Sequence, residues 1–209
     1  MTKVKICGIK TLQAGLTALD AGADYLGFMF YAASPRAIDV DEATHLIDEL
    51  RQEHPTGWKA VGVVVNEPIE VVNAIVHRAK VDVVQCSGDE PPDFIRTVEA
   101  PVFKAVRVGA PCSAPSEWGA ERLLVDANVS GQYGGTGVTY DWSTVRALVA
   151  DGFLAGGLTP DNVETAITVA RPWGVDVSSG VEANGTKSLD LIRAFLAAVR
   201  SADTELARL

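Results

Sequence analysis

The stretch VKICGIKTLQAGLTALDAGADYLGFMF, residues 4–30, predicts a strand, a helix and a second strand in succession. Val4–Ile6 and Tyr25–Phe30 are strand candidates, and Tyr25–Phe30 is continuously apolar, as is typical of parallel strands covered on both faces. Between them, Leu12, Leu16, Leu19 and Ala23 recur at the spacing that places residues on one face of a helix. The turn after the first strand reads CGIK at 7–10 and lacks the GxGxxG pattern of a dinucleotide-binding sheet. The stretch therefore predicts one unit of a parallel α/β fold that does not bind a dinucleotide.

The same alternation continues along the chain. Strand-like runs recur at Ala60–Val65, Val81–Gln85, Val102–Val106, Leu123–Asp126, Phe153–Ala155 and Val175–Val177. Apolar residues at helical spacing recur within Val40–Leu50, Ile69–Val76 and Leu189–Val199. Eight strands in 209 residues predict an α/β protein that forms a single (β/α)8 TIM barrel domain over residues 1–209. An open doubly wound sheet is the alternative, and it fits worse because such sheets usually have fewer strands.

Three segments depart from this regular pattern. Gly109–Gly119 contains Pro111 and Pro115 and shows little periodicity, so we expect the fifth helix to be short or absent. A glycine-rich loop is expected between Ala127 and Thr139. The tail past Ser201 is expected to fray.

Composition excludes several classes of protein. A hydrophobic content of 47% is enough for one core, which argues against a disordered chain. The formal net charge is −9 without a basic stripe, so we expect no nucleic-acid partner and no membrane partner. An anionic substrate would have to be held by local donors against this negative field. The oligomeric state is not readable from the sequence.

The three cysteines, Cys7, Cys86 and Cys112, have no CxxC spacing, which argues against disulfides and a zinc site. The histidines have no partner at metal-ligand spacing, so no metal is expected. The apolar run at the N-terminus is too short for a signal peptide, and no run reaches the roughly 18 residues that span a bilayer. We therefore expect a cytoplasmic protein.

Glycine-containing loops follow the last two predicted strands, with a glycine pair in LAGGLTP at 154–160 and a single glycine after the strand in GVDVSSGVE at 174–182. Glycines let backbone N–H groups approach an oxyanion, and TIM barrels often bind phosphate at these two loops. Thr159 and Pro160 match a helix N-cap followed by proline at the first helical position. Tight turns without a ligand are the alternative, but two such segments on adjacent final strands favour phosphate.

Three further side chains lie at or after predicted strand ends, where barrel enzymes place their catalytic groups. Cys7 ends the first strand, although a buried cysteine is often only a small apolar residue. Asp126 ends the sixth strand after an apolar run that would raise its pKa, as a general acid needs, although it could also be a solvated turn residue. Arg36 follows the second strand and could clamp a carboxylate, or simply lie on the surface.

With these residues in place, the sequence resembles the phosphoribosylanthranilate isomerase family of tryptophan biosynthesis. The matching motifs run in order along the chain: KICGI at 5–9, GF at 27–28, SPR at 34–36, LVD at 124–126, GGTG at 134–137, DW at 141–142, LAGGL at 154–158 and GVDVSSGVE at 174–182. The resemblance implies an isomerase that converts N-(5-phosphoribosyl)anthranilate into an aminodeoxyribulose phosphate by an Amadori rearrangement.

The resemblance also implies roles for individual residues. Cys7 matches the general base and Asp126 the general acid. Arg36 and Asp176 match substrate-binding groups, Asp176 near the anthranilate end. The implied phosphate-binding residues are Gly156, Gly157, Ser179 and Gly180. Lys5 and Arg36 are the cations that could help Cys7 lose its proton, if the fold brings them close.

Two segments depart from the family pattern. The family commonly has Gln-Leu-His-Gly after the fourth strand, but this chain has QCSG at 85–88, which puts a histidine contribution there in doubt. NGTKS at 184–188 replaces a common Pro-Gly-x-Lys-Asp run, and this difference is expected to affect only the approach to the last helix.

The implied chemistry needs no metal and no organic cofactor, because the substrate nitrogen can itself accept electrons as an iminium. The histidine-pathway isomerase is the nearest alternative enzyme. That family looks as if it uses aspartate where this chain has Cys7, and it is built from two similar halves, whereas this sequence shows no convincing half-repeat. A non-catalytic phosphosugar sensor is the alternative from another class. It would keep the glycine loops without needing both Cys7 and Asp126.

Overall fold

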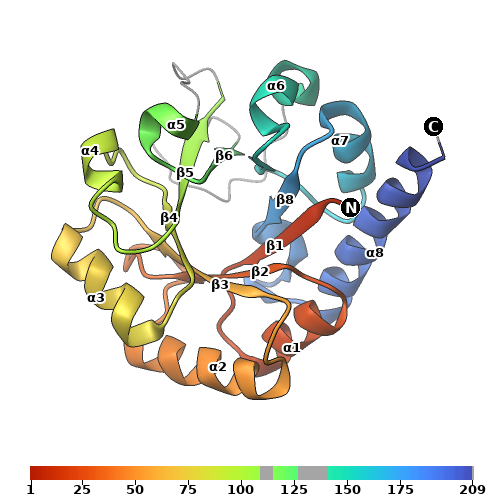
Figure 1. Ribbon diagram of the computed structural model, residues 1–209. Helices are drawn as coiled ribbons and strands as arrows, with labels where there is room; N and C mark the ends of the chain where they lie inside the picture. The colour runs from red at the N-terminus through yellow and green to blue at the C-terminus, as the bar shows by residue number, and fades with distance from the viewer. Residues whose placement is uncertain (109–114, 127–140, 209) are drawn as a thin grey trace.

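The computed structural model describes residues 1–108, 115–126 and 141–208. Its eight parallel strands form a closed barrel in the order of the chain (Figure 1). The strands are β1 (Lys3–Cys7), β2 (Tyr25–Met29), β3 (Lys59–Val64), β4 (Val83–Cys86), β5 (Val102–Arg107), β6 (Arg122–Asp126), β7 (Phe153–Leu154) and β8 (Gly174–Val177). The predicted TIM barrel is thus confirmed, and each predicted strand run overlaps one of these strands.

Helices surround this ring of strands (Figure 1). They are α1 (Leu12–Asp20), α2 (Val40–Glu53), α3 (Ile69–Ala79), α4 (Pro92–Ile95), α5 (Pro115–Trp118), α6 (Arg146–Val149), α7 (Val163–Ala170) and α8 (Leu189–Leu206), with the 3₁₀ helices η1 (Trp142–Val145) and η2 (Ser179–Val181). The fifth helix is short, as expected. The predicted glycine-rich loop between Ala127 and Thr139 lies outside the described residues.

Polar side chains define where several helices begin. Thr11 accepts a hydrogen bond from the backbone N–H of Ala14 at the start of α1, and Ser188 accepts one from Leu191 at the start of α8. Such side chains satisfy N–H groups that the first helical turn leaves unpaired. The N-cap predicted at Thr159 is not formed. Residues 159–162 form a turn in which the carbonyl of Thr159 accepts hydrogen bonds from the N–H groups of Asn162 and Val163, and α7 begins only at Val163.

The barrel interior holds large aromatic side chains at one end and smaller side chains at the other. Tyr25, Phe103, Phe153 and Trp173 pack ring against ring with centroids 5.1–6.2 Å apart. Tyr25 and Phe153 begin their strands, so these rings close the amino-terminal end of the barrel. Cys7, Val63 and Ala155 continue the same interior cluster toward the carboxyl ends of the strands. These smaller side chains leave the carboxyl end as the place for a site.

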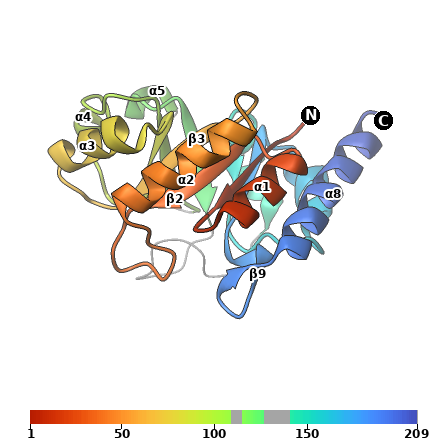
Figure 2. The same cartoon turned by 90° about the horizontal axis from the view of Figure 1, so that it is seen from below.

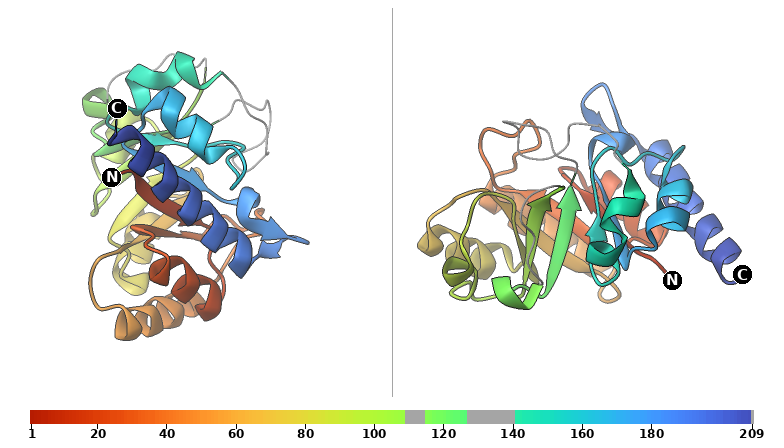
Figure 3. Two further views of the ribbon diagram at one scale, coloured as in Figure 1. Left: turned by 90° about the vertical axis from the view of Figure 1, so that its right-hand side faces the viewer. Right: turned by 90° about the horizontal axis from the view of Figure 1, so that it is seen from above.

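The start of the chain lies beside α8 (Figure 3). Asp203 on α8 accepts hydrogen bonds from the backbone N–H of Thr2 at 2.9 and 3.0 Å and from its hydroxyl at 2.6 Å. Ala202 is fully buried beside this contact. The expected fraying past Ser201 is therefore wrong, because these contacts hold the last turns of α8 against β1 and the helix continues to Leu206.

A short hairpin extends from the loop after β8. Its strands are β9 (Glu182–Ala183) and β10 (Thr186–Lys187). The hairpin projects on the same side of the barrel as the long loop between β2 and α2 (Figure 2). Both belong to the carboxyl end of the barrel, where parallel strands deliver their loops.

Candidate active site

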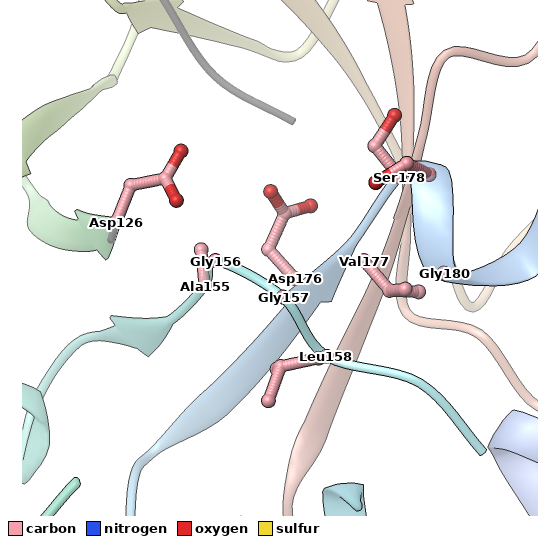
Figure 4. Close-up of a pocket in the computed structure, with 10 residues that line it drawn as sticks. Asp126, Ala155, Gly156, Gly157, Leu158, Asp176, Val177, Ser178 and Gly180 are labelled. Atoms are coloured by element: carbon pink, nitrogen blue, oxygen red, sulfur yellow. The ribbon is translucent and has the colours of Figure 1, made fainter. Parts of the chain in front are cut away.

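One pocket lies at the carboxyl end of the last three strands. It is lined by Asp126 of β6, by 155–158 after β7 and by 176–180 in β8 and its loop. The carboxyl groups of Asp126 and Asp176 point into the same space above Gly156 and Gly157 (Figure 4). The barrel therefore brings together most of the residues that the sequence singled out.

The glycines of this pocket have steric reasons to be glycine. Gly156 and Gly157 have φ values of +85° and +65°, a region that costs L side chains energy. A methyl group on Gly180 would lie 1.8 Å from the carbonyl oxygen of Leu158, so the two loops touch through backbone alone. No hydrogen bond within the described residues uses the N–H of Gly156 or Gly157. These donors, together with the start of η2 at Ser179, suit an oxyanion.

Cys7 lies at the end of β1 and is buried, with 4% of its surface exposed. A methyl group on the neighbouring Gly27 would lie 2.8 Å from its sulfur and 3.2 Å from Nζ of Lys5, so the missing side chain leaves room for both. Burial raises the pKa of the thiol, Lys5 and Lys187 oppose this, and Asp176 adds to it. The net effect is a raised pKa.

Lys5 and Asp176 form a buried ion pair beside that sulfur. Nζ of Lys5 lies 2.7 Å from Oδ1 of Asp176, and the two side chains are 0% and 10% exposed. Burial alone would lower the pKa of Lys5, but the charge and hydrogen bond of Asp176 and the sulfur of Cys7 outweigh it and raise the pKa. The β1–β8 register pairs Lys5 with Asp176 directly, which explains why residues 171 positions apart meet. The fold thus brings Lys5, the first of the two expected cations, directly beside Cys7.

Arg36 is held by a carboxylate of the chain itself. Its Nε and Nη2 donate to the two carboxylate oxygens of Glu182 at 2.8 and 2.9 Å. A methyl group on Gly8 would lie 2.9 Å from Cδ of Arg36, so Gly8 allows the arginine to cross the end of β1. This bidentate pair joins the loop after β2 to the hairpin after β8 and fixes the guanidinium next to Cys7.

Lys187 is a site residue that the sequence reasoning missed. Its Nζ lies 2.6 Å from Oε1 of Glu182 and 2.9 Å from the carbonyl of Ser178, whose hydroxyl donates to the carbonyl of Cys7. Burial lowers the pKa of Lys187 despite Glu182. The two positions at which 184–188 departs from the family run are Asn184, in the turn of the hairpin, and Ser188, the N-cap of α8, so the departure itself leaves Lys187 in place. The lysine shared with the family's Pro-Gly-x-Lys-Asp run was the signal that could have identified it.

The loop after β4 holds a second buried ion pair, outside the pocket. Nζ of Lys104 lies 2.7 Å from Oε2 of Glu90 and donates to the carbonyl of Gly88 at 2.6 Å. Cys86 is buried on the outer face of β4, and burial raises its pKa to about 12. A thiol of this kind stays protonated and packs as an apolar group.

Among the described residues, no group of three or more His, Cys, Asp or Glu side chains is placed to hold a metal ion. None of the helices in the described part of the chain is both long enough and apolar enough to cross a membrane.

Comparison with known proteins reveals close relatives. The family model described as N-(5'phosphoribosyl)anthranilate (PRA) isomerase matches residues 4–198. The N-(5'-phosphoribosyl)anthranilate isomerase of Trichlorobacter lovleyi is 46% identical over 202 residues, which are 94% of this chain and 97% of the relative. The crystal structure of phosphoribosyl anthranilate isomerase from Thermotoga maritima superimposes with a TM-score of 0.83 at 36% identity and covers 96% of this chain and 100% of that one. A phosphoribosyl anthranilate isomerase in complex with reduced 1-(o-carboxyphenylamino)-1-deoxyribulose 5-phosphate gives a TM-score of 0.80 at 34% identity, with 96% and 100% covered.

Proposed function

The chain belongs to the N-(5'-phosphoribosyl)anthranilate isomerase family, and on this premise we propose that Cys7 is its general base and Asp126 its general acid. The protein is an isomerase that converts N-(5'-phosphoribosyl)anthranilate in tryptophan biosynthesis. The observation that carries the proposal is the strand order. The glycine-lined pocket belongs to β7 and β8, so it lies between β6, which ends in Asp126, and β1, which ends in Cys7. A phosphosugar in that pocket has one group on either side.

In the first step Asp126 donates a proton to the furanose ring oxygen. The bond between this oxygen and C1 breaks, and the nitrogen lone pair forms a C1 iminium. The thiolate of Cys7 then removes the proton from C2, and the electrons of that C–H bond form a C1–C2 double bond while the iminium electrons return to nitrogen. The resulting enolamine gains a proton at C1 and loses one from the C2 hydroxyl, so no net proton is consumed.

Lys5 supplies the positive charge that this mechanism needs beside Cys7. The thiol must lose its proton in a buried place, and burial disfavours its thiolate. A buried ammonium next to the sulfur partly offsets this cost, and Asp176 keeps that ammonium charged. Lys5 is therefore a positioning residue that acts through Cys7.

The remaining contacts bind the substrate. We assign the phosphate to the backbone donors of Gly156, Gly157, Ser179 and Gly180. Arg36, fixed by Glu182, binds the anthranilate carboxylate, and Asp176 faces the anilino end of the ligand. The complex of a relative with a reduced aminodeoxyribulose phosphate supports a small-molecule phosphoribosyl ligand.

Three broader assignments complete the proposal. We treat residues 1–209 as one barrel domain, since the family match spans most of that length. The net charge of −9 supports the absence of nucleic-acid and anionic-membrane partners. A biosynthetic enzyme of this family is assigned to the cytoplasm, and it needs no metal or organic cofactor.

Two substitutions test the acid and base roles by turnover of N-(5'-phosphoribosyl)anthranilate. We expect Asp126→Asn and Cys7→Ser each to lower kcat by about 10²–10⁴-fold, because each removes a positioned proton-transfer group. Binding of the reduced product should stay within about threefold of the parent protein, since neither change removes a proposed binding contact. Each substitution is nearly isosteric, so thermal unfolding should change little.

Alkylation provides an independent check on Cys7. Iodoacetamide should inactivate the parent enzyme, bound product analogue should protect it, and peptide mapping should identify Cys7 as the modified thiol. A Cys7→Ser protein that keeps more than about a tenth of the parent kcat would remove the base assignment. An Asp126→Asn protein with that much activity would remove the acid assignment.

A further inference from the structure

Gln85 has a buried oxygen that the described part of the chain leaves without a partner. The residue is 5% exposed, and its Nε2 donates to the hydroxyl of Ser87 at 3.0 Å. Oε1 is buried and has no hydrogen-bond partner among the described residues. If the carboxamide were turned over, the Ser87 hydroxyl would donate instead and Nε2 would be the unpaired atom. In either orientation Ser87 satisfies one end of the group only.

The side chain of Gln85 faces the interior of the barrel. In the sheet Gln85 pairs with Val63 of β3 and Phe103 of β5, and both of these side chains belong to the interior cluster. Paired residues of neighbouring strands point to the same face, and Val83, two residues earlier, belongs to that cluster too. Gln85 is the last inward residue of β4, so it lies toward the carboxyl end that holds the pocket.

Its position in the ring suggests which part of the ligand it meets. β4 and β8 are four strands apart in the eight-stranded barrel, so Gln85 lies across the interior from Asp176. The proposed phosphate site is at β7 and β8. In the substrate, the anilino nitrogen is attached to C1, at the opposite end of the sugar from the 5-phosphate. A ligand held by its phosphate therefore extends its nitrogen away from these loops, into the interior that Asp176 and Gln85 line from opposite sides.

We propose that the carboxamide oxygen of Gln85 accepts a hydrogen bond from the anilino N–H of the substrate. This inference rests on the proposed phosphate site. The contact strengthens when the nitrogen carries the positive charge of the iminium, because hydrogen bonds to charged groups are stronger. Gln85 thus both positions the nitrogen and stabilises the ring-opened cation.

The test exploits an asymmetry in the energetics of buried polar groups. Replacing a buried group that lacks its partner by an apolar one of similar shape costs little stability, whereas loss of a bond to the ligand weakens binding. We expect Gln85→Leu to unfold at the same or a higher temperature than the parent. Its affinity for the reduced product 1-(o-carboxyphenylamino)-1-deoxyribulose 5-phosphate should fall by about tenfold or more, and kcat should fall as well. Gln85→Met is a second apolar variant should the branched side chain fail to fold.

Two comparisons make the result specific. Gln52→Leu makes the same chemical change at an exposed position of α2 and should leave activity unchanged. Affinity for 1-deoxyribulose 5-phosphate, which lacks the arylamine, should be the same in Gln85→Leu and in the parent. Unchanged affinity for the reduced product, or an equal loss for both ligands, would overturn the amine contact. Because the measurement is of binding, a failure of the Cys7 and Asp126 assignments would not alter it.

Discussion

At the scale of single residues, the sulfur of Cys7 lies among charges whose effects oppose one another. Burial raises its pKa, Lys5 lowers it, Asp176 raises it and Lys187 lowers it, and the sum is a raised pKa. A base with a raised pKa is mostly protonated at neutral pH but accepts a proton readily once ionised. The activity should therefore increase with pH through the pKa of this thiol.

The first prediction concerns the direction in which two charge changes move that pH dependence. Lys5→Met removes an influence that lowers the pKa of Cys7, so the rising limb of kcat/KM should move to higher pH. Asp176→Asn removes one that raises it, so the limb should move to lower pH. A pH profile of kcat/KM for the two variants and the parent measures both shifts.

Each of these variants leaves one buried charge unpaired, so each is expected to lose stability. Thermal unfolding must therefore show that the measured protein is folded at every pH used. Limbs that move in the same direction, or do not move, would contradict the assignment of Cys7 as the titrating base. The direction of the shift separates an electrostatic role from a general loss of structure, which has no reason to give opposite signs.

At the scale of elements, the pocket to which we assign the phosphate depends on close contact between the loop after β7 and η2. Gly180 lies against the carbonyl of Leu158, where a methyl group would approach to 1.8 Å. Gly156 and Gly157 turn the preceding backbone with positive φ, so that their N–H groups are not used by the sheet. Neither loop alone would form the proposed anion site, because the donors come from both.

The second prediction follows from this contact. Gly180→Ala must push the two loops apart, so KM for N-(5'-phosphoribosyl)anthranilate should increase by about tenfold or more while kcat falls less. Gly185→Ala is the matched control, since its φ is +77° but a methyl group there meets nothing within 4 Å. The control should show only the modest stability cost of a left-handed alanine, about 1–2 kcal/mol. Equal effects of the two variants on KM would argue against a phosphate site in this pocket.

At the scale of the whole molecule, the first and the last strand of the barrel pair with each other and close the ring. β1 pairs with β8, and α8 packs over α1 and α7. The carboxylate of Asp203 on α8 also accepts hydrogen bonds from Thr2 and from Arg200. The strand that carries Lys5 and Cys7 is thus held from both sides.

The third prediction is that Asp203→Ala lowers stability without changing the chemistry. Loss of these charge-assisted bonds should cost about 1–3 kcal/mol. For a protein of this size that corresponds to a decrease in Tm of roughly 3–10 °C. Glu205→Ala, an exposed position on the same turn of α8, is the control and should change Tm by no more than about 1–2 °C. A large change in kcat with an unaltered Tm would contradict a purely structural role.

The fold and the strand-end residues could be read from the sequence because both depend on local order. Short apolar runs that alternate with segments of helical spacing specify eight strand–helix units. The carboxyl ends of parallel strands all lie on one side of the barrel. Cys7, Asp126 and the glycine loops were found in this way. The local pattern failed at Thr159, where a plausible cap is a turn, and past Ser201, where contacts with Thr2 keep the helix ordered.

The interaction partners of those residues could not be predicted, because they come from segments that are distant in the sequence. Barrel closure places Lys5 against Asp176, and the hairpin after β8 brings Glu182 and Lys187 to Arg36. The sequence alone specified the elements, their order and the residues at their ends, since propensity and hydrophobic period act over a few residues. The charges that surround Cys7, and the burial of a Gln85 oxygen that no described residue pairs with, were settled only by packing. Electrostatic effects depend on distance in space, and residues 171 positions apart become neighbours only when the barrel closes.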